Sequence, residues 1–101
     1  MAAKSNLRKV VDETTDVRCA SGLGRMREEV WQDKNGVVVR YNLAFINRYL
    51  TSRDNGRVLG YDNNHGYHHR HFMGETSAIE TRDYGVIYDR FIDEVRELRK
   101  E

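Results

Sequence analysis

Apolar residues recur with a period of two in the middle of the chain. From position 37 to 45 every second residue is apolar, and polar residues such as Arg40 and Asn42 lie between them. A period of two is typical of a β-strand with one buried face. The residues on the apolar face of this predicted strand, which spans 37–47, are Val37, Val39, Tyr41, Leu43 and Phe45.

Further strands are predicted on either side, separated by turn signals. Residues 26–32 precede Asp33-Lys34-Asn35-Gly36, while residues 57–63 follow Arg53-Asp54-Asn55-Gly56 and residues 68–73 come next. Asn-Gly is the strongest short hairpin signal, because both residues tolerate positive φ in a type I′ turn. The pattern predicts an antiparallel meander of four or more strands.

The hydrophobic period changes to that of a helix near the end of the chain. From Asp83 onward, apolar residues recur at steps of three and four, and Arg99-Lys100 would favour the negative end of a helix dipole. We predict a long amphipathic helix that packs on the Val37, Val39 and Tyr41 face of the sheet; a partner groove is the alternative. The predicted buried stripe consists of Tyr84, Ile87, Tyr88, Phe91, Ile92, Val95 and Leu98.

The N-terminal region has a shorter and weaker pattern. Leu7, Val10 and Val11 follow helical spacing, and Ser5 or Asn6 would cap a helix over residues 5–14. A strand through residues 8–11 is the alternative, and residues 21–24 form a flexible break. We expect one α+β domain over residues 1–101, with an antiparallel sheet, a C-terminal helix and room for an N-terminal helix.

Composition excludes several classes of protein. The 101 residues are 39% hydrophobic and 33% charged, with 17 Lys and Arg against 16 Asp and Glu, which is globular and not disordered. A net charge of +1 means that a nucleic-acid site would have to be a local patch. Cys19 alone forms no internal disulfide. The first residues, MAAKSNLRKV, lack the apolar run typical of a signal peptide, and no stretch approaches the length of a membrane span. We therefore expect a cytoplasmic protein.

All four histidines fall within the run GYDNNHGYHHRHF, residues 60–72. One interpretation is acid–base chemistry on RNA, in which imidazoles move protons and an arginine steadies the phosphate charge. In a regular strand, Arg70 would face away from His69 and His71, so a bulge would be needed to unite all three. The candidate catalytic residues are His69, His71, Arg70, His68 and Asp62.

Two other interpretations of the cluster remain open. His69 and His71 on one strand face, with Asp62 from the neighbouring strand, could bind a metal ion, although no named zinc spacing is present. The histidines could also be structural and hydrogen-bond to Asp62 and Asn63.

Residues that could contact RNA lie beside the cluster. Tyrosines could stack on bases, and arginines that flank the central strands could position phosphates. The candidate RNA-binding residues are Tyr61, Asn63, His65, Tyr67, Arg40 and Arg57.

Two segments of this region resemble the TumE family of prokaryotic toxin–antitoxin toxins. The segment 57–63, Arg-Val-Leu-Gly-Tyr-Asp-Asn, is similar to the family's R-L-V-G-Y-D-N, and His69-Arg70-His71 before Phe72 is similar to H-R-H-Y. The tyrosine-containing strand 39–45 and the helix around 91–95 also fit, so that the resemblance covers residues 37–98.

The resemblance implies a toxin encoded beside an antitoxin with a helix-turn-helix domain. Because RNA cleavage is the commonest activity of such small toxins, we expect a metal-independent endoribonuclease with no cofactor, acting on RNA and away from membranes. The alternatives are a non-enzymatic module that binds nucleic acid or protein, and a metal-dependent nuclease that uses the histidines. The oligomeric state stays open.

Overall fold

The computed structural model describes residues 7–101, apart from the side chain of His65. It contains six strands followed by one α-helix, with a short 3₁₀ turn on each side of the fourth strand. The elements are β1 (Arg8–Cys19), β2 (Gly22–Gln32), β3 (Val38–Ile46), η2 (Arg53–Gly56), β4 (Arg57–Asp62), η3 (Asn64–Gly66), β5 (His69–Phe72), β6 (Glu75–Ala78) and α1 (Tyr84–Leu98).

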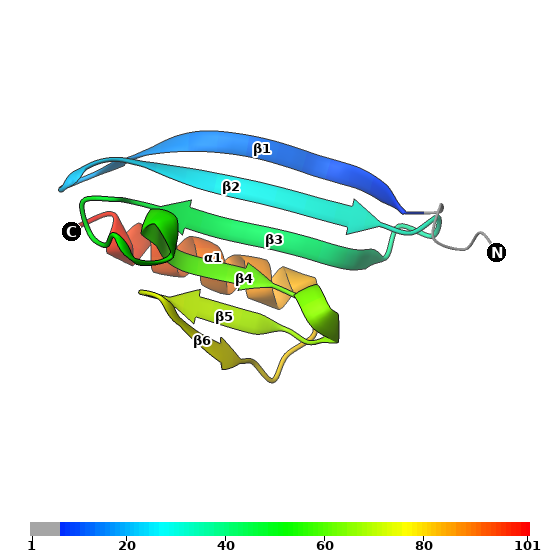
Figure 1. Ribbon diagram of the computed structural model, residues 1–101. Helices are drawn as coiled ribbons and strands as arrows, with labels where there is room; N and C mark the ends of the chain where they lie inside the picture. The colour runs from blue at the N-terminus through cyan, green and yellow to red at the C-terminus, as the bar shows by residue number, and fades with distance from the viewer. Residues whose placement is uncertain (1–6) are drawn as a thin grey trace.

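The strands form a single sheet in chain order, β1-β2-β3-β4-β5-β6, and each strand is antiparallel to its neighbours. Helix α1 runs along one face of this sheet, behind β3 and β4 in Figure 1. We call this the helix face, and we call the opposite side, away from α1, the open face. The predicted α+β fold, a meander with a C-terminal helix on it, is confirmed.

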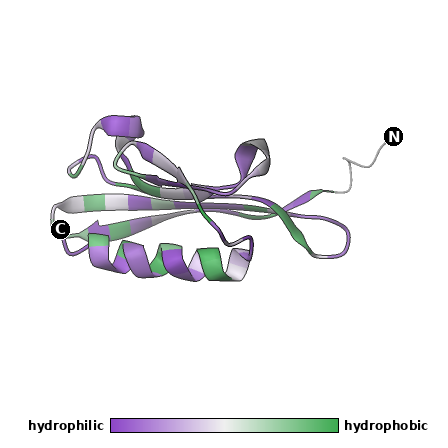
Figure 2. Ribbon diagram, turned by 90° about the horizontal axis from the view of Figure 1, so that it is seen from below, coloured by the Kyte–Doolittle hydropathy of each residue, from purple (hydrophilic) through white to green (hydrophobic). Residues whose placement is uncertain are grey.

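The hydrophobic core lies between α1 and the middle of the sheet. The apolar side of α1 faces the strands, while its polar side faces away (Figure 2). Phe91 is fully buried and meets the ring of Tyr61 edge-on at 6.4 Å between centroids, which confirms its predicted position on the buried stripe. The largest core side chains are Tyr41, Leu43, Phe45, Val58, Leu59, Tyr61, Ile87 and Phe91.

Both ends of α1 are fixed by hydrogen bonds. Asp83 caps the N-terminus, because its Oδ1 accepts a hydrogen bond from the Val86 amide at 3.1 Å. Beyond the C-terminus, the Arg99 carbonyl accepts from the Ala20 amide, and the Glu101 carbonyl accepts from the Ser21 amide, each at 2.9 Å. The helix is thereby tied to the turn between β1 and β2.

The predicted N-terminal helix is wrong for the residues that the structure describes. Residues 8–19 form β1, which extends the strand alternative for residues 8–11, while the proposed caps Ser5 and Asn6 lie outside the described residues. The long antiparallel pairing of β1 with β2 outweighs three apolar residues at helical spacing. The expected flexible break at 21–24 is also wrong, because β2 already begins at Gly22.

Val37 and Val39 are not covered by the helix, contrary to the prediction. Val37 and Val39 remain 56% and 43% exposed, whereas Tyr41 is buried. Tyr84 at the start of α1 packs against Tyr41 at 5.2 Å between ring centroids, so the helix does reach this part of the sheet. A register shift between Trp31 and Gln32 pairs Val38 with Gln32 and places Val38, in place of Val37 and Val39, beside Tyr84 and Tyr88.

The two Asn-Gly signals give different connections. Residues 33–36 form the predicted hairpin turn, but only Gly36 has a positive φ, at 80°, so the turn is not type I′. The second signal is not a tight hairpin, because residues 47–56 all separate β3 from β4. Asp54, Asn55 and Gly56 adopt φ of 51°, 57° and 84° there, a left-handed run that returns the chain to the sheet.

One strand was missed by the sequence patterns. β6 covers only four residues, Glu75–Ala78, all of them exposed, so no hydrophobic alternation marks it.

Within residues 7–101, no helix has the length and apolar character needed to cross a membrane.

Candidate functional site

The register between β4 and β5 divides the histidine run between the two faces of the sheet. Asp62 is paired with His69, Tyr61 with Arg70, and Gly60 with His71, without a bulge. Directly paired residues point to the same side of a sheet, and successive residues point to opposite sides. Asp62, His69 and His71 therefore share the open face, whereas Tyr61 and Arg70 belong to the helix face.

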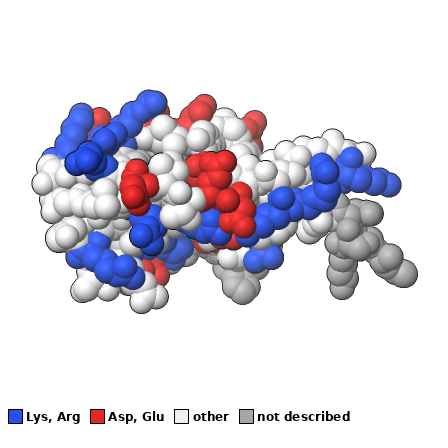
Figure 3. Space-filling view, turned by 90° about the horizontal axis from the view of Figure 1, so that it is seen from above, with Lys and Arg blue, Asp and Glu red and all other residues white. Residues whose placement is uncertain are grey.

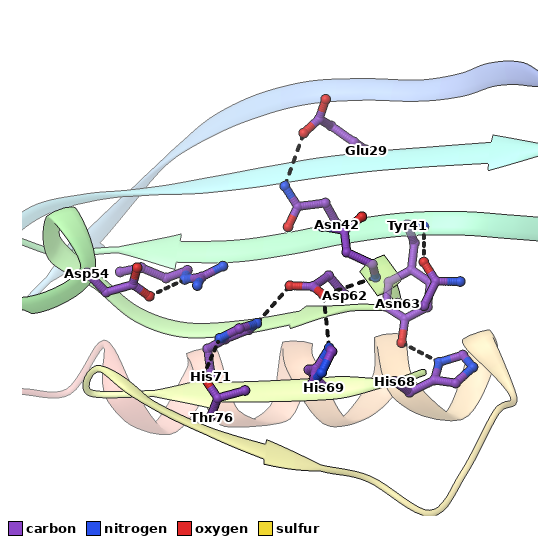
Figure 4. A network of polar contacts seen from close by, with 12 residues as sticks. Glu29, Tyr41, Asn42, Asp54, Asp62, Asn63, His68, His69, His71 and Thr76 are labelled. Carbon is purple, nitrogen blue, oxygen red and sulfur yellow. Dashed lines mark hydrogen bonds and ion pairs between the residues drawn. The ribbon is translucent and has the colours of Figure 1, made fainter. Parts of the chain in front are cut away.

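On the open face, the two histidines share the carboxylate of Asp62 (Figure 4). Asp62 is only 6% exposed. Its Oδ2 lies 2.7 Å from Nε2 of His71, and its Oδ1 lies 3.5 Å from Nδ1 of His69 and accepts a hydrogen bond of 3.2 Å from the Asn64 amide. We call Asp62, His69 and His71 the open-face triad.

The contacts of His71 determine its tautomer. An ionised carboxylate can only accept, so the hydrogen of His71 lies on Nε2, which donates to Asp62. Nδ1 is then the basic nitrogen, and it lies 3.2 Å from the Thr76 hydroxyl on β6, which can donate to it. His71 is thus oriented on one side and available as a proton acceptor on the other.

His69 is placed between an aromatic ring and its histidine neighbour. Its ring centroid is 4.2 Å from that of Tyr67 and 5.9 Å from that of His71. The side chains of His69 and His71 are 12% and 16% exposed, while Tyr67 is 57% exposed. The open-face triad is therefore accessible from solvent beside a free aromatic surface.

Arg57 supplies a cation on the same face. A Cβ added at Gly60 would lie 3.0 Å from Cδ and 3.3 Å from Nη1 of Arg57, so the arginine crosses the strand at this glycine. Gly60 is paired with His71, and Nε of Arg57 donates to Oδ2 of Asp54 at 2.6 Å. A glycine inside a strand often marks such a close approach, and this is the signal by which sequence reasoning could have placed Arg57 beside the histidines.

Arg70 belongs to a different network, on the helix face. Its guanidinium donates to the Tyr61 hydroxyl at 3.2 Å and to the carboxylate of Glu94 on α1, which also accepts from Tyr61. Burial, followed by the hydrogen bond to Glu94, raises the pKa of Tyr61 to about 12. The Glu94 carboxylate raises the pKa of Arg70 further. The sheet thus separates Arg70 from His69 and His71.

His68 lies apart from the open-face triad as well. Its Nδ1 is 2.7 Å from the hydroxyl of Tyr41, and the two rings are stacked at 5.6 Å between centroids. Burial lowers the pKa of His68, and the nearby Arg82 and His69 add to the shift. Burial also raises the pKa of Tyr41, so that the phenol keeps its proton and donates it to His68.

The remaining predicted RNA contacts are scattered. Asn63 uses its whole amide on β3: Oδ1 accepts from the Tyr41 amide at 3.0 Å, and Nδ2 donates to the Val39 carbonyl at 2.8 Å. Arg40 lies over the ring of Trp31 at 4.8 Å. The side chain of His65 lies outside the described residues. Seen from the β1 edge, basic and acidic side chains are mixed and form no uniformly basic surface (Figure 3).

Among the described side chains, no group of three His, Cys, Asp or Glu residues has the arrangement of a metal site. In the open-face triad, Asp62 already contacts both imidazoles directly.

Cys19 is half-buried, and its thiol donates to the Val17 carbonyl at 3.4 Å.

Comparison with known proteins gives one match. The sequence profile of the family described as Toxin TumE matches residues 25–99. The chain belongs to the TumE family. The match runs from β2 to the end of α1 and includes every element of the open-face triad, so it is wider than the resemblance over residues 37–98. No curated protein and no solved structure matches the chain.

Membership of the TumE family makes this chain a toxin of a toxin–antitoxin system. It also implies a cognate antitoxin as partner. Both the R-V-L-G-Y-D-N run and the H-R-H run that carried the resemblance lie inside the matched residues, on β4 and β5.

Proposed function

We propose that this TumE toxin is a metal-independent endoribonuclease and that the open-face triad is its active site. The observation that supports it best is the 2.7 Å contact between Asp62 and His71, with His69 on the other oxygen of the same carboxylate. A buried carboxylate that orients an imidazole and stabilises its protonated form supports acid–base chemistry. We further propose that the neutralising antitoxin carries a helix-turn-helix domain.

In the proposed reaction, His71 is the base. Its Nδ1 takes the proton of the RNA 2′-hydroxyl, and the resulting oxygen attacks the adjacent phosphorus. Asp62 stabilises the imidazolium that forms, because its carboxylate accepts from Nε2 of His71. The Thr76 hydroxyl lies 3.2 Å from Nδ1, and in this proposal the RNA 2′-hydroxyl replaces it.

His69 is the acid in this scheme. Protonated and paired with Asp62 through Nδ1, it presents Nε2 to the leaving 5′-oxygen, whose bond to phosphorus breaks as the proton is transferred. The products are a 2′,3′-cyclic phosphate and a 5′-hydroxyl. One imidazole thus takes up a proton and the other releases one, and this scheme needs no metal ion.

Arg57 and Tyr67 are the proposed substrate contacts. The guanidinium of Arg57 lies on the triad's face, where it can neutralise charge on the phosphate. The exposed ring of Tyr67 packs beside His69, where it can stack on a base next to the cleaved bond. In this proposal Arg57 takes the part that the sequence pattern gave to Arg70.

The decisive experiment is cleavage of RNA by the purified toxin with and without excess EDTA. We expect cleavage to survive chelation and to yield 2′,3′-cyclic phosphate ends. An RNA with a 2′-deoxy residue at the cleaved position should resist, since it lacks the attacking hydroxyl. Loss of cleavage in EDTA that one added metal restores would favour the metal-dependent nuclease instead.

The second candidate is a non-enzymatic module that binds nucleic acid or protein through the same face. Its support is that both ring nitrogens of His71 already have partners within the protein. A toxin that arrests growth and binds RNA without producing discrete ends would establish this alternative.

A further inference from the structure

Helix α1 leaves part of the helix face uncovered. It packs on β3 and β4, and a helix about 10 Å wide covers roughly two strands that lie about 4.8 Å apart. The sheet has six strands, and within residues 7–101 no second α-helix lies on the side of β1 and β2 that faces the helix layer. We call this surface the shelf.

The shelf contains two grooves that follow α1 along its length. The first has a volume of about 430 Å³, and the second about 370 Å³. Apolar residues line both, and the first is lined chiefly by Val11, Val30, Val38, Tyr84 and Tyr88. The second is lined chiefly by Thr15, Val17, Met26, Ile92 and Val95. The two grooves follow one another along β1 and α1, and we call them together the trough.

The first groove carries two carboxylates. Glu13 and Glu28 are directly paired across β1 and β2, so both point into the trough. In the part of the chain that the structure describes, neither forms an ion pair with Lys or Arg. Burial, with Glu13 nearby, raises the pKa of Glu28. Two like charges opposite each other on a sheet are unfavourable and would be relieved by a cation.

The second groove has mainly the opposite charge. Arg18, Arg96 and Arg99 lie along it, with Asp16 as the acidic residue. The trough is therefore acidic beside the first turns of α1 and chiefly basic beside the last turns. Such a gradient fixes the direction in which a charged helix can lie.

We propose that the shelf is the docking surface for the antitoxin and that the occupant is an amphipathic antitoxin helix lying beside α1. Its basic residues face Glu13 and Glu28, and its acidic residues face Arg96 and Arg99. A helix matched to the 15 residues of α1 would be about 22 Å long. The inference rests on TumE membership and on the shelf, and not on RNA cleavage.

The position of the shelf separates docking from the open-face triad. The shelf belongs to the helix face, whereas Asp62, His69 and His71 lie on the other side of the sheet. RNA is disfavoured as the occupant, because Glu13 and Glu28 would repel its phosphates. Variants of the shelf should therefore change antitoxin binding without changing toxicity.

The test uses the full-length toxin and its purified cognate antitoxin. The double variant Glu13→Lys/Glu28→Lys should bind the antitoxin at least about 100-fold more weakly by calorimetry, since it places like charges against each other. In cells it should remain toxic and no longer be neutralised. Glu75→Lys/Glu80→Lys reverses two charges at the opposite edge of the sheet and is the matched control, with unchanged affinity expected.

A second variant does not depend on charge. Thr15 is exposed in the second groove, so Thr15→Arg should fill the trough without disturbing the core and weaken binding at least about tenfold. Wild-type affinity in both shelf variants would overturn the proposal. So would a toxin that is dimeric by light scattering and becomes monomeric in these variants, because the occupant would then be a second copy. If the shelf variants lose antitoxin binding as expected but the wild-type toxin does not cleave RNA, only the proposed function is refuted.

Discussion

The four residues of β5 serve different purposes on the two faces of the strand. On the helix face, Arg70 is held by Tyr61 and Glu94, and this network joins α1 to the sheet. On the open face, His69 and His71 share Asp62 and remain in contact with solvent. Residues that are adjacent in sequence can therefore belong to separate networks, because a strand points them to opposite sides.

The largest expected effect concerns the open face. His69→Ala or His71→Ala should lower the rate of RNA cleavage about 10²- to 10⁴-fold, the usual loss when a general acid or base is removed. The rate should be measured with purified protein whose thermal unfolding matches the wild type. His68→Gln is the control from the other network and should retain cleavage. Full toxicity in the His69/His71 double variant would contradict every catalytic role for the open-face triad.

The next largest effect should come from the core under the helix face. Phe91→Ala removes a fully buried ring and should reduce the free energy of unfolding by about 3–5 kcal/mol. In a domain whose total stability is about 5–10 kcal/mol, that could unfold a large fraction of the molecules. Chemical denaturation of the variant and the wild type measures this difference in the free energy of unfolding. A variant with unchanged stability that no longer binds the antitoxin would show that this stripe is an interface.

A comparison of two arginines distinguishes the faces directly. Arg57→Lys should lower cleavage about tenfold, because an ammonium does not reproduce the guanidinium fork on a phosphate. Arg70→Lys should instead lower the melting temperature and leave the cleavage rate of the folded protein nearly unchanged, since Arg70 bonds to Tyr61 and Glu94. The reverse result would place the phosphate on the helix face.

The smallest effect should be a dependence of stability on pH through His68. Its pKa is lower in the folded protein than the ordinary value of 6.5, so the unfolded chain binds more protons on acidification. The stability contributed by this histidine is present above about pH 6.5 and is lost as the pH falls through the lowered pKa. Melting temperatures from pH 7.5 to 5 should fall less steeply in His68→Gln than in the wild type. Parallel curves would mean that His68 does not titrate as described.

Strong local patterns allowed the sequence to predict much of this fold. The alternation in β3 and the period of α1 are carried by residues that face the core, so burial leaves a clear mark on them. β1 and β6 are edge strands with mostly exposed side chains, and their pairing is decided by tertiary contacts that leave little periodicity. Val37 and Val39 were predicted as buried because an alternating pattern does not reveal a register shift such as the one beside Val39.

The candidate site was predictable in part. The pairing of Asp62 with His69 follows from the sequence once β4 and β5 are aligned, and the separation of Arg70 follows from a regular strand. The crossing of Arg57 over Gly60 and the contact of Thr76 with His71 depend on side-chain conformation and on a strand that had no pattern. Their roles therefore became visible only in three dimensions.

The strictly consecutive strand order has a consequence for the speed of folding. Each strand pairs with the strand before it, so most β pairing closes short stretches of chain, and such topologies fold quickly for their size. The hairpin that holds the open-face triad comprises only residues 57–72 and can form before α1 docks. The helix, whose contacts reach back to Ala20 and Ser21, would complete the structure last. The local pairing that positions the triad is thus separate in sequence from the long-range contacts that close the core.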